Sequence, residues 1–152
     1  MKKVRNAVRC FLIQDDKVVC IKYKTGEMGY LDIPGGKIEE GETPEEASIR
    51  EVYEETGMTV NKLISVGDTI IEYPDRIFNF KVYLATEFSG IPQEQEENES
   101  FFITLDDLAK EEKRFDITYL LTSKELKKDF DKKHIKVKFY CDSNHKVLKI
   151  EK

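Results

Sequence analysis

The chain has 152 residues, of which 39% are hydrophobic and 36% are charged, and its net charge at pH 7 is −5. This balance is typical of a globular protein and argues against a disordered one. The acidic net charge also argues against a protein that binds long nucleic acids, because such binding requires a basic face.

The cysteines and the hydropathy pattern bear on location. Cys10, Cys20 and Cys141 are odd in number, far apart and without a Cys-x-x-Cys pair. We interpret them as reduced thiols that pack as small apolar residues. No apolar stretch reaches the length of a membrane span. We therefore expect a cytoplasmic protein that does not interact with membranes.

The first part of the chain is predicted to be β-rich. Residues 4–14 carry apolar side chains on both faces, which is typical of a strand covered on both sides. Asp15 and Asp16 form a tight turn into a second strand at 17–23, so the pair is predicted to be a hairpin. A polar loop at 24–29 and a short strand at 30–33 lead to a glycine turn.

A helix is predicted next. Thr43-Pro44-Glu45-Glu46 is a capping box with proline at the first helical position, so the helix is expected to begin at Pro44. Gly57 is expected to end it. At 100° per residue, one side of this helix should face the core and the other should be acidic. The expected core side holds Ile49, Val52, Tyr53 and Thr56, and the acidic side holds Glu51, Glu54 and Glu55.

Two long strands should follow this helix. Residues 60–73 are predicted to form a strand that is interrupted at Gly67-Asp68, and residues 77–88 another. The acidic run at 93–99 is too polar to pack and is predicted to be a solvated loop.

The last part of the chain is predicted to contain two helices and a hairpin. One helix opens within 104–108 with Thr104 or Asp106 as its cap, and a second covers 117–130. Alternating strands at 135–140 and 146–150 should form a terminal hairpin. An isolated hairpin is marginally stable, so it must join a sheet or pair with a second copy in a homodimer.

The acidic side of the helix suggests a site for a hard divalent cation. Mg²⁺ prefers oxygen ligands and is often shared between a few carboxylates and substrate phosphates. The turn before the helix allows the backbone to approach a ligand closely, and Lys37 supplies a charge for phosphate. Arg50 lies one turn before Glu54 and can orient a carboxylate.

Residues 36–58 resemble the Nudix box, G-x5-E-x7-R-E-U-x-E-E-x-G-U, where U is aliphatic. The fixed positions are all present, as Gly36, Glu42, Arg50, Glu51, Glu54, Glu55 and Gly57, with Val52 and Met58 at the apolar ones. The segment GGKIEEGETPEEA is similar to sequences of the MutT branch of that family.

The resemblance implies an α/β fold: a Nudix-type α/β/α sandwich around a mixed β-sheet, here with an extra C-terminal hairpin. A single domain over 1–152 is expected, with its core at about 4–130 and the hairpin extension at 131–152. The implied activity is hydrolysis of a pyrophosphate bond in a nucleoside diphosphate linked to a group X, with Mg²⁺ or Mn²⁺ as cofactor.

The resemblance also assigns roles to residues. Glu54 and Glu55 are the implied principal metal ligands, and Glu51 is either a third ligand or the base that activates water. Gly36 offers its backbone to the metal, and Arg50 orients Glu51 or Glu54. A further ligand is expected from the acidic loop, at Glu99, with Glu96 and Glu97 as substitutes.

The substrate is a small nucleotide in this interpretation. Lys37 is the candidate phosphate contact, Tyr30 and Phe78 are candidate aromatic walls, and Asn79 is a candidate reader of a base edge. The MutT-like segment favours a nucleoside triphosphate such as 8-oxo-dGTP. Pro74 falls where relatives that cleave ADP-ribose carry a proline, and Tyr73 near where dinucleoside polyphosphate hydrolases carry a tyrosine.

Three alternatives remain open at this point. A nucleotide sensor with a non-catalytic Nudix fold would typically lack box glutamates. A structural metal-binding module would use the terminal hairpin as its dimer edge and would show no turnover. An enzyme acting on RNA 5′ ends would need a basic path, which the net charge makes less favourable.

Overall fold

The computed structural model describes residues 1–25, 31–122 and 135–152. Its strands are β1 (Lys3–Phe11), β2 (Ile13–Gln14), β3 (Lys17–Tyr23), β4 (Gly35–Lys37), β5 (Thr59–Glu72), β6 (Arg76–Ser89), β7 (Asn98–Thr104), β8 (Ile135–Cys141) and β9 (Val147–Glu151). Its helices are α1 (Pro44–Thr56), α2 (Leu105–Lys110) and α3 (Phe115–Thr122). No helix in these ranges is long and apolar enough to cross a membrane.

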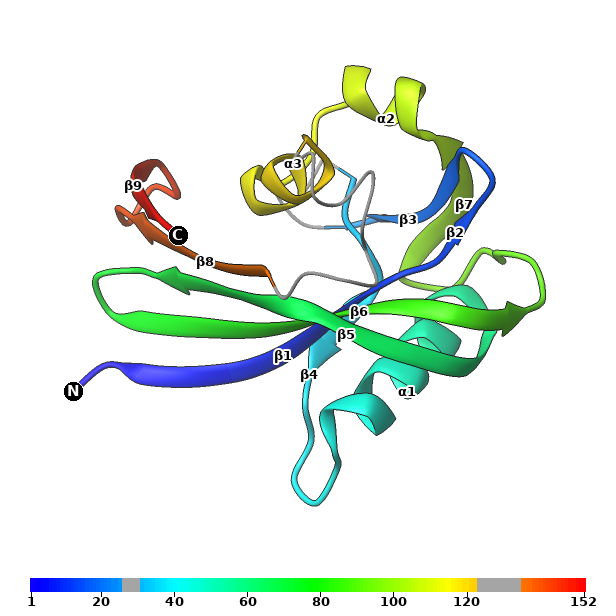
Figure 1. Ribbon diagram of the computed structural model, residues 1–152, viewed down its shortest axis with the longest axis horizontal. Coiled ribbons are helices and arrows are strands. Elements are labelled where there is room, and N and C mark those ends of the chain that lie inside the picture. The colour runs from blue at the N-terminus through cyan, green and yellow to red at the C-terminus, as the bar shows by residue number, and fades with distance from the viewer. Residues whose placement is uncertain (26–30, 123–134) are drawn as a thin grey trace.

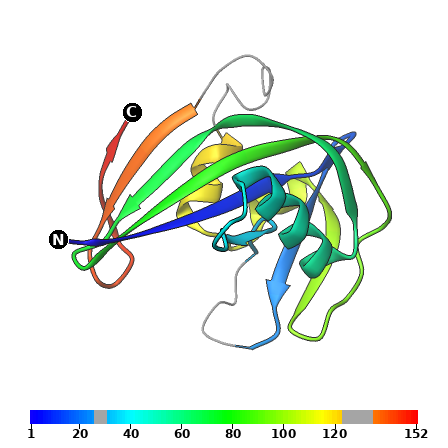
Figure 2. The same ribbon diagram turned by 90° about the horizontal axis from the view of Figure 1, so that it is seen from below.

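The strands form two sheets. The larger is a mixed six-stranded sheet in the order β4-β1-β6-β5-β8-β9, and the smaller has the order β2-β3-β7. Strand β1 runs parallel to β6, and β5 runs parallel to β8. Figures 1 and 2 show α1 on one face of the larger sheet and α3 on the other. This arrangement confirms the predicted α/β sandwich around a mixed sheet.

The predicted strand at 4–14 is two strands in two different sheets. The chain leaves the larger sheet after Phe11, and β2 pairs with β3 in the smaller one. Leu12 lies between them and is fully buried. The expected hairpin is therefore confined to β2 and β3, where Ile13 is opposite Val18. The continuous apolar pattern hid the break because both sheets bury their inner faces.

Helix α1 begins and ends as predicted. Thr43 accepts a hydrogen bond from the Glu46 amide at 3.1 Å, and the Glu46 carboxylate accepts one from the Thr43 amide at 3.2 Å. These two bonds are the reciprocal pair of a capping box. At the other end, Gly57 has a φ of 75° and its amide bonds to the Tyr53 carbonyl.

The expected core face of α1 was wrong at two positions. Ile49 is 38% exposed and Tyr53 is 62% exposed. The residues that α1 buries instead are Ala47, Ser48, Val52, Glu55 and Thr56. Val52 and Thr56 were predicted correctly. The buried side of α1 is therefore not its most hydrophobic side, because the helix directs the carboxylate of Glu55 inward.

Gly67 lies within the continuous strand β5, where the sequence suggested an interruption. A Cβ atom built on Gly67 would lie 2.6 Å from the Ile135 backbone nitrogen, and its φ is 149°. The register with β6 shifts between Ser65 and Gly67, which marks a bulge. Glycine is required at this position because β8 starts directly beside it.

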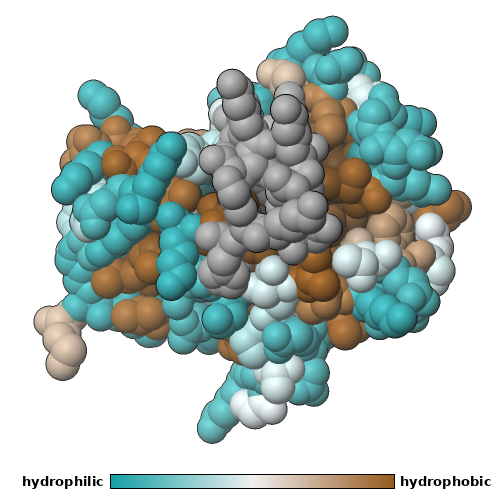
Figure 3. All heavy atoms as spheres, viewed as in Figure 1, coloured by the Kyte–Doolittle hydropathy of each residue, from teal (hydrophilic) through white to brown (hydrophobic). Residues whose placement is uncertain are grey.

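The terminal hairpin joins the larger sheet of its own chain. Strand β8 pairs with β5, with Gly67 opposite Ile135 and Glu72 opposite Tyr140, and β9 pairs with β8. The hairpin is thus confirmed, and its partner is the sheet. The left end of the molecule in Figure 3, where the hairpin lies, mixes hydrophilic and hydrophobic residues.

The two predicted helices of the second half are α2 and α3. Thr104 caps α2 through a hydrogen bond from the Asp107 amide, which confirms one of the two expected caps. Helix α3 begins at Phe115, two residues earlier than predicted. The rest of the predicted helix, at 123–130, lies outside the described residues.

Buried side chains form a core on each face of the larger sheet. On the α1 face, Val8, Cys10, Val52 and Tyr83 pack in one cluster. On the other face, Phe11, Val82 and Leu120 belong to a second cluster and Phe80 and Phe139 to a third. The three cysteines are free and buried. Burial raises the pKa of Cys10 to about 12, so its thiol stays protonated.

Candidate active site

The glycine turn is strand β4, which pairs antiparallel with β1. Gly36 is opposite Val8 in this ladder. A Cβ atom built on Gly36 would lie 2.6 Å from the Glu51 carboxylate carbon and 2.7 Å from one of its oxygens. Glycine at this position therefore leaves the room that the Glu51 carboxylate occupies.

Arg50 gathers the carboxylates around this turn. Its Nε and Nη2 donate hydrogen bonds to Glu42, at 2.7 and 2.9 Å. Its Nη1 lies 2.9 Å from Glu51 Oε1 and 3.2 Å from Glu54 Oε2. Nη2 also donates to the Lys37 carbonyl at 3.0 Å. The guanidinium thus contacts three carboxylates, and its hydrogen bonds lower the pKa of Glu42 to about 2.

Glu55 is a buried carboxylate, 8% exposed. Its Oε1 accepts a hydrogen bond from the Gly35 amide at 2.8 Å, and its Oε2 accepts one from the Tyr23 hydroxyl at 3.0 Å. Burial is the largest cause that raises its pKa to about 8, and the charge of Glu51 adds to it. Burial likewise raises the pKa of Glu51. Both pKa shifts come first from burial of the carboxylate, and the negative charges of neighbouring carboxylates add to them.

A cleft of about 430 Å³ opens above these residues. Five glutamates line it: Glu51, Glu54, Glu55, Glu96 and Glu97. The other lining residues are Tyr23, Gly35, Gly36, Gln95 and Asn98. Three of the glutamates come from α1 and two from the acidic loop, so the cleft joins the two acidic regions of the sequence.

The acidic loop is held in place and is not simply solvated. The Gln93 amide donates to the Thr56 carbonyl at 2.8 Å, and the Lys24 amide donates to the Glu97 carbonyl at 3.0 Å. The Ser100 hydroxyl donates to the Gln93 carbonyl at 2.6 Å. These bonds hold the loop between the end of α1 and the strands β3 and β7.

The structure places Glu96 and Glu97 at the cleft, and Glu99 away from it. Glu99 is exposed on β7, opposite Lys22 of β3, and does not line the cleft. Glu99 was preferred because the family resemblance implies a ligand glutamate a few residues before an aromatic residue. Side chains alternate along a strand, so the buried Asn98 and Ser100 direct Glu99 outward.

The predicted substrate residues are brought together only in part. Lys37 and Phe78 line a second, mostly apolar cavity of about 180 Å³, with Arg5, Asn6, Ala7, Gly36 and Phe80. This cavity shares Gly36 with the cleft. Phe78 stacks on Phe80, with ring centroids 5.9 Å apart and an angle of 18° between the ring planes. Tyr30 lies outside the described residues.

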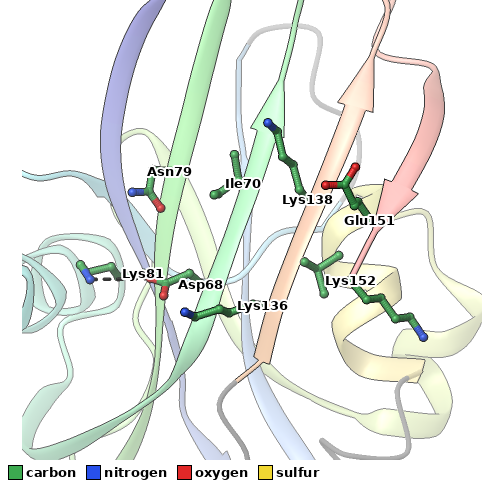
Figure 4. Close-up of a pocket in the computed structure, with 9 residues that line it drawn as sticks. Asp68, Ile70, Asn79, Lys81, Lys136, Lys138, Glu151 and Lys152 are labelled. Atoms are coloured by element: carbon green, nitrogen blue, oxygen red, sulfur yellow. Dashed lines mark ion pairs between the residues drawn. The ribbon is translucent and has the colours of Figure 1, made fainter.

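Asn79 lies in a different cavity. Figure 4 shows it among lysines of the larger sheet, in a hollow of about 340 Å³ formed by β6, β5, β8 and β9. The Asp68–Lys81 ion pair crosses this hollow, with a distance of 3.7 Å between the charged atoms. Gly36 and the glutamates of the cleft do not line this hollow, whereas Asn79 and Lys81 do. The structure therefore does not bring Asn79 to the candidate site.

Tyr23 and Asn98 line the cleft and were missed by the sequence analysis. Tyr23 is the last residue of β3 and Asn98 the first of β7. Burial and the charge of Glu55 raise the pKa of Tyr23, so its hydroxyl keeps its proton and donates. Their place at strand ends beside polar segments was the available signal, but no spacing rule connects them to the box.

A buried group of charges lies behind the glycine turn. Arg9 of β1 is 3% exposed and contacts Asp32 and Asp116, and Arg114 contacts the same two carboxylates. Asp32 also accepts a hydrogen bond from the Ile33 amide at 2.8 Å. Arg9 lies over the Phe80 ring, 4.2 Å from its centroid. These contacts connect α3, β1 and the segment that enters the turn.

The donor set of the cleft fits a hard divalent cation. All of its charged lining groups are carboxylates, and Arg50 contacts only Glu51 and Glu54 among them. Oxygen-rich sites of this kind suit Mg²⁺ and Mn²⁺. Within the described ranges, no three His, Cys, Asp or Glu side chains already converge on one point as a finished metal site. A cation would have to draw the carboxylates together.

Comparison with known proteins gives consistent relatives. An 8-oxo-dGTP diphosphatase of Haemophilus influenzae is 40% identical over 73 residues, which cover 48% of this chain and 54% of that protein. An ADP-ribose pyrophosphatase of Bacillus subtilis is 36% identical over 114 residues, covering 68% of this chain and 60% of that protein. The chain therefore matches between half and two thirds of the length of these two relatives.

Solved structures share the fold. A MutT protein from Bacillus halodurans has a TM-score of 0.82 at 20% identity, and the match covers 97% of this chain and 96% of that one. A MutT NUDIX hydrolase from Burkholderia pseudomallei has a TM-score of 0.62 at 28% identity and covers 69% of this chain and 86% of that one. The first match extends over almost the whole chain, so the fold similarity includes the terminal hairpin.

The family model with the description NUDIX domain matches residues 3–136. This range contains β1 to β7 and the three helices, ends at the second residue of β8, and contains every glutamate of the cleft. The chain belongs to the NUDIX domain family.

Proposed function

We propose that this protein hydrolyses a pyrophosphate bond in a nucleoside diphosphate linked to a group X, with Mg²⁺ as cofactor and Mn²⁺ as its substitute. The observation that carries the proposal is the cleft in which five glutamates meet the glycine turn. The relatives named as diphosphatases and pyrophosphatases support the same chemistry.

The proposed roles follow from position. Glu51, Glu54 and Glu55 would hold the cation from α1, and Glu96 or Glu97 would complete the site from the acidic loop. We propose these two in place of Glu99, because they line the cleft. When bound, the cation would neutralise phosphate charge and lower the barrier to attack by water.

The chain itself orients the reacting groups. Arg50 fixes Glu51 and Glu54 through its Nη1 and is itself fixed by Glu42. One of the cleft glutamates accepts the proton of the attacking water, with Glu51 and Glu54 as the candidates.

The nucleoside end of the substrate has a place beside the cleft. The smaller cavity is mostly apolar and has Phe78 and Phe80 in its wall, which suits a flat ring, while Lys37 is positioned for phosphate. We propose that the phosphates lie over Gly36, which both cavities share, and that the base enters the smaller one.

Among substrates, we propose a nucleoside triphosphate of the 8-oxo-dGTP type. The similarity to the 8-oxo-dGTP diphosphatase of Haemophilus influenzae supports it. The second candidate is ADP-ribose, which the longer match to the Bacillus subtilis pyrophosphatase favours. Pro74 does not help to choose, because it lies exposed in the turn between β5 and β6.

The test is a product assay with Mg²⁺ across canonical and oxidised nucleoside triphosphates, ADP-ribose, dinucleoside polyphosphates and nucleotide sugars, with Glu54→Gln as the blank. Release of monophosphate and pyrophosphate from one triphosphate is the expected result. Turnover of ADP-ribose would select the second candidate. A nucleotide sensor would bind substrate without any turnover that depends on Glu54, and that result would overturn the proposal.

Location and assembly are also proposals. Three buried free thiols suit a reducing compartment, which supports the cytoplasm. Strand β9 is the last strand in the order of the larger sheet, so a second copy would pair there in a homodimer. Sizing of the purified protein tests the second proposal, and a monomer at every concentration would contradict it.

A further inference from the structure

Two cross-strand partners of the smaller sheet hold Glu55 from two sides. Tyr23 of β3 is directly opposite Asn98 of β7. The Tyr23 hydroxyl donates to Glu55 Oε2 at 3.0 Å, while the Asn98 side-chain amide donates to the Glu55 carbonyl at 2.8 Å. The smaller sheet therefore contacts both the side chain and the main chain of one residue of α1.

Each of these bonds meets a need of a buried group. A carboxylate that is 8% exposed requires donors, and Tyr23 and the Gly35 amide supply one to each oxygen. The Glu55 carbonyl belongs to the last turn of α1, where carbonyls lack partners within the helix. Asn98 supplies that partner. Tyr23 holds the carboxylate of Glu55 and Asn98 holds its main-chain carbonyl. Together these two donors leave the carboxylate little freedom to turn.

Asn98 also connects Glu55 to the acidic loop. It directly follows Glu97, which lines the cleft, and its carbonyl accepts a hydrogen bond from the Gln95 amide at 2.8 Å. The same residue thus sets the position of the Glu55 main chain and closes the turn that carries Glu96 and Glu97. A displacement of Asn98 would change the spacing between the carboxylates of α1 and those of the loop.

We propose that Tyr23 and Asn98 are positioning residues that set the affinity of the cleft for its divalent cation. Neither belongs to the glutamate motif, and neither needs to touch the cation. They act by presenting Glu55, and through Asn98 also Glu97, in a fixed geometry. This inference rests on the proposed metal-dependent function of the cleft.

Tyr23→Phe is the sharpest variant, because it removes one hydroxyl and keeps the ring. Tyr53→Phe is the matched control, since Tyr53 is 62% exposed on α1. Mn²⁺ binding is measured by electron paramagnetic resonance, and Mg²⁺ binding by the rise in melting temperature. Partners that orient metal ligands typically change affinity about 10–100-fold, so we expect that loss for Tyr23→Phe and no change for Tyr53→Phe.

The metal-free melting temperature separates positioning from a general loss of structure. The loss of one hydrogen bond should lower it by only about 2–4 °C. Turnover of Tyr23→Phe should return to within a few-fold of the native rate at saturating Mg²⁺. A rate that stays low at saturating metal, or a loss of the folded state, would overturn the positioning role.

Asn98→Ala tests the second half of the pair, with the exposed Asn61→Ala as its control. We expect weaker Mn²⁺ binding for Asn98→Ala and unchanged Mn²⁺ binding for Asn61→Ala. In a Glu55→Gln background, Tyr23→Phe should cause no further loss, because its action passes through Glu55. A further loss of the same size in that background would contradict the proposal.

The two proposals fail in different ways. Native protein that binds neither Mn²⁺ nor Mg²⁺ would overturn the proposed function, and with it the role of these residues. Native protein that binds the metals, together with a Tyr23→Phe variant that binds them equally well, would overturn only the present inference.

Discussion

Arg50 and Glu42 form a two-point contact across the turn that precedes α1. The Nε of Arg50 lies 2.7 Å from Glu42 Oε2, and its Nη2 lies 2.9 Å from Glu42 Oε1. Paired contacts of this kind hold a guanidinium in one plane. The remaining nitrogen, Nη1, is thereby directed at Glu51 and Glu54. Glu42 therefore acts on the cleft through Arg50.

Glu42→Gln should weaken activity while the fold stays intact. The variant keeps the shape of the side chain but loses the charge that holds Arg50, so Glu51 and Glu54 become less well oriented. Partners of this kind are typically worth about 10–100-fold in metal affinity or activity. The measurement is kcat/KM across Mg²⁺ concentrations, with the exposed Glu40→Gln as control. Equal values for both variants would contradict this role.

Glu54→Gln should abolish turnover without unfolding the protein. The Glu54 side chain is 56% exposed, so it contributes little to packing, yet it lines the cleft. Loss of a proposed direct ligand should cost more than the roughly 100-fold upper range of its supporting partners. Turnover and circular dichroism are measured on the same sample. A variant that loses its circular dichroism signal would show that Glu54 is needed for folding.

Val52→Asp and Ile49→Asp should differ sharply in stability. Val52 is fully buried in α1, whereas Ile49 is 38% exposed. An unpaired charge at position 52 should cost several kcal/mol. Ile49→Asp should stay within about 1 kcal/mol, as exposed substitutions usually do. Urea unfolding measures the free energy of unfolding of both variants. A larger loss for Ile49→Asp than for Val52→Asp would support the core face expected from the sequence.

The metal-free protein should lose stability as the pH rises. Glu55 has a pKa of about 8 in the folded state against a reference value of 4.5, so the folded state binds the extra proton. Stability from this group is complete below about pH 4.5 and is lost as the pH rises toward 8. The slope is at most about 1.4 kcal/mol per pH unit.

Melting temperatures in chelator at several pH values measure this slope. Glu55→Gln should flatten it, because the amide does not titrate. Added Mg²⁺ should restore stability at the high end of the window, since a cation favours the ionised carboxylate. An identical slope in native protein and in Glu55→Gln would assign the effect to other groups.

Arg9→Met should be strongly destabilising although it lies outside the motif. Arg9 is 3% exposed and contacts Asp32 and Asp116, so its loss leaves two buried carboxylates with Arg114 as their remaining charged contact. Breaking a buried ion pair in this way typically costs about 3–5 kcal/mol. Denaturant unfolding gives the value, with the exposed Arg5→Met as control. A cost below about 1 kcal/mol for Arg9→Met would show that the cluster relaxes easily.

The features predicted correctly were those with strong local signals. The capping box at Thr43 and the left-handed stop at Gly57 fix the bounds of α1 through bonds within a few residues, so the sequence alone revealed them. The same holds for the cap of α2 at Thr104. Helical periodicity placed Glu51, Glu54 and Glu55 together on α1, the family resemblance then suggested their roles, and the structure brings all three to one cleft.

What could not be predicted depends on contacts between distant segments. Glu55 is buried because Tyr23 and Gly35 supply its donors, and no rule of helical periodicity anticipates that. Hydrophobicity therefore assigned the inner face to Ile49 and Tyr53. Local patterns fail most often at functional sites, and this helix lines the candidate site. The choice between Glu97 and Glu99 similarly depended on the point at which β7 begins.

The parallel pairing of β8 with β5 has a further consequence for solubility. Without residues 135–141, the backbone amides and carbonyls of Gly67–Glu72 would form an open edge beside Ile70 and Ile71. An uncovered edge of this kind is a template on which other chains can add strands and aggregate. The C-terminal segment covers that edge and leaves the five-residue β9 outermost, which carries Lys149 and is followed by Lys152. A short edge limits such addition to one short partner strand, as in the proposed homodimer, so the extension protects the sheet from open-ended polymerisation.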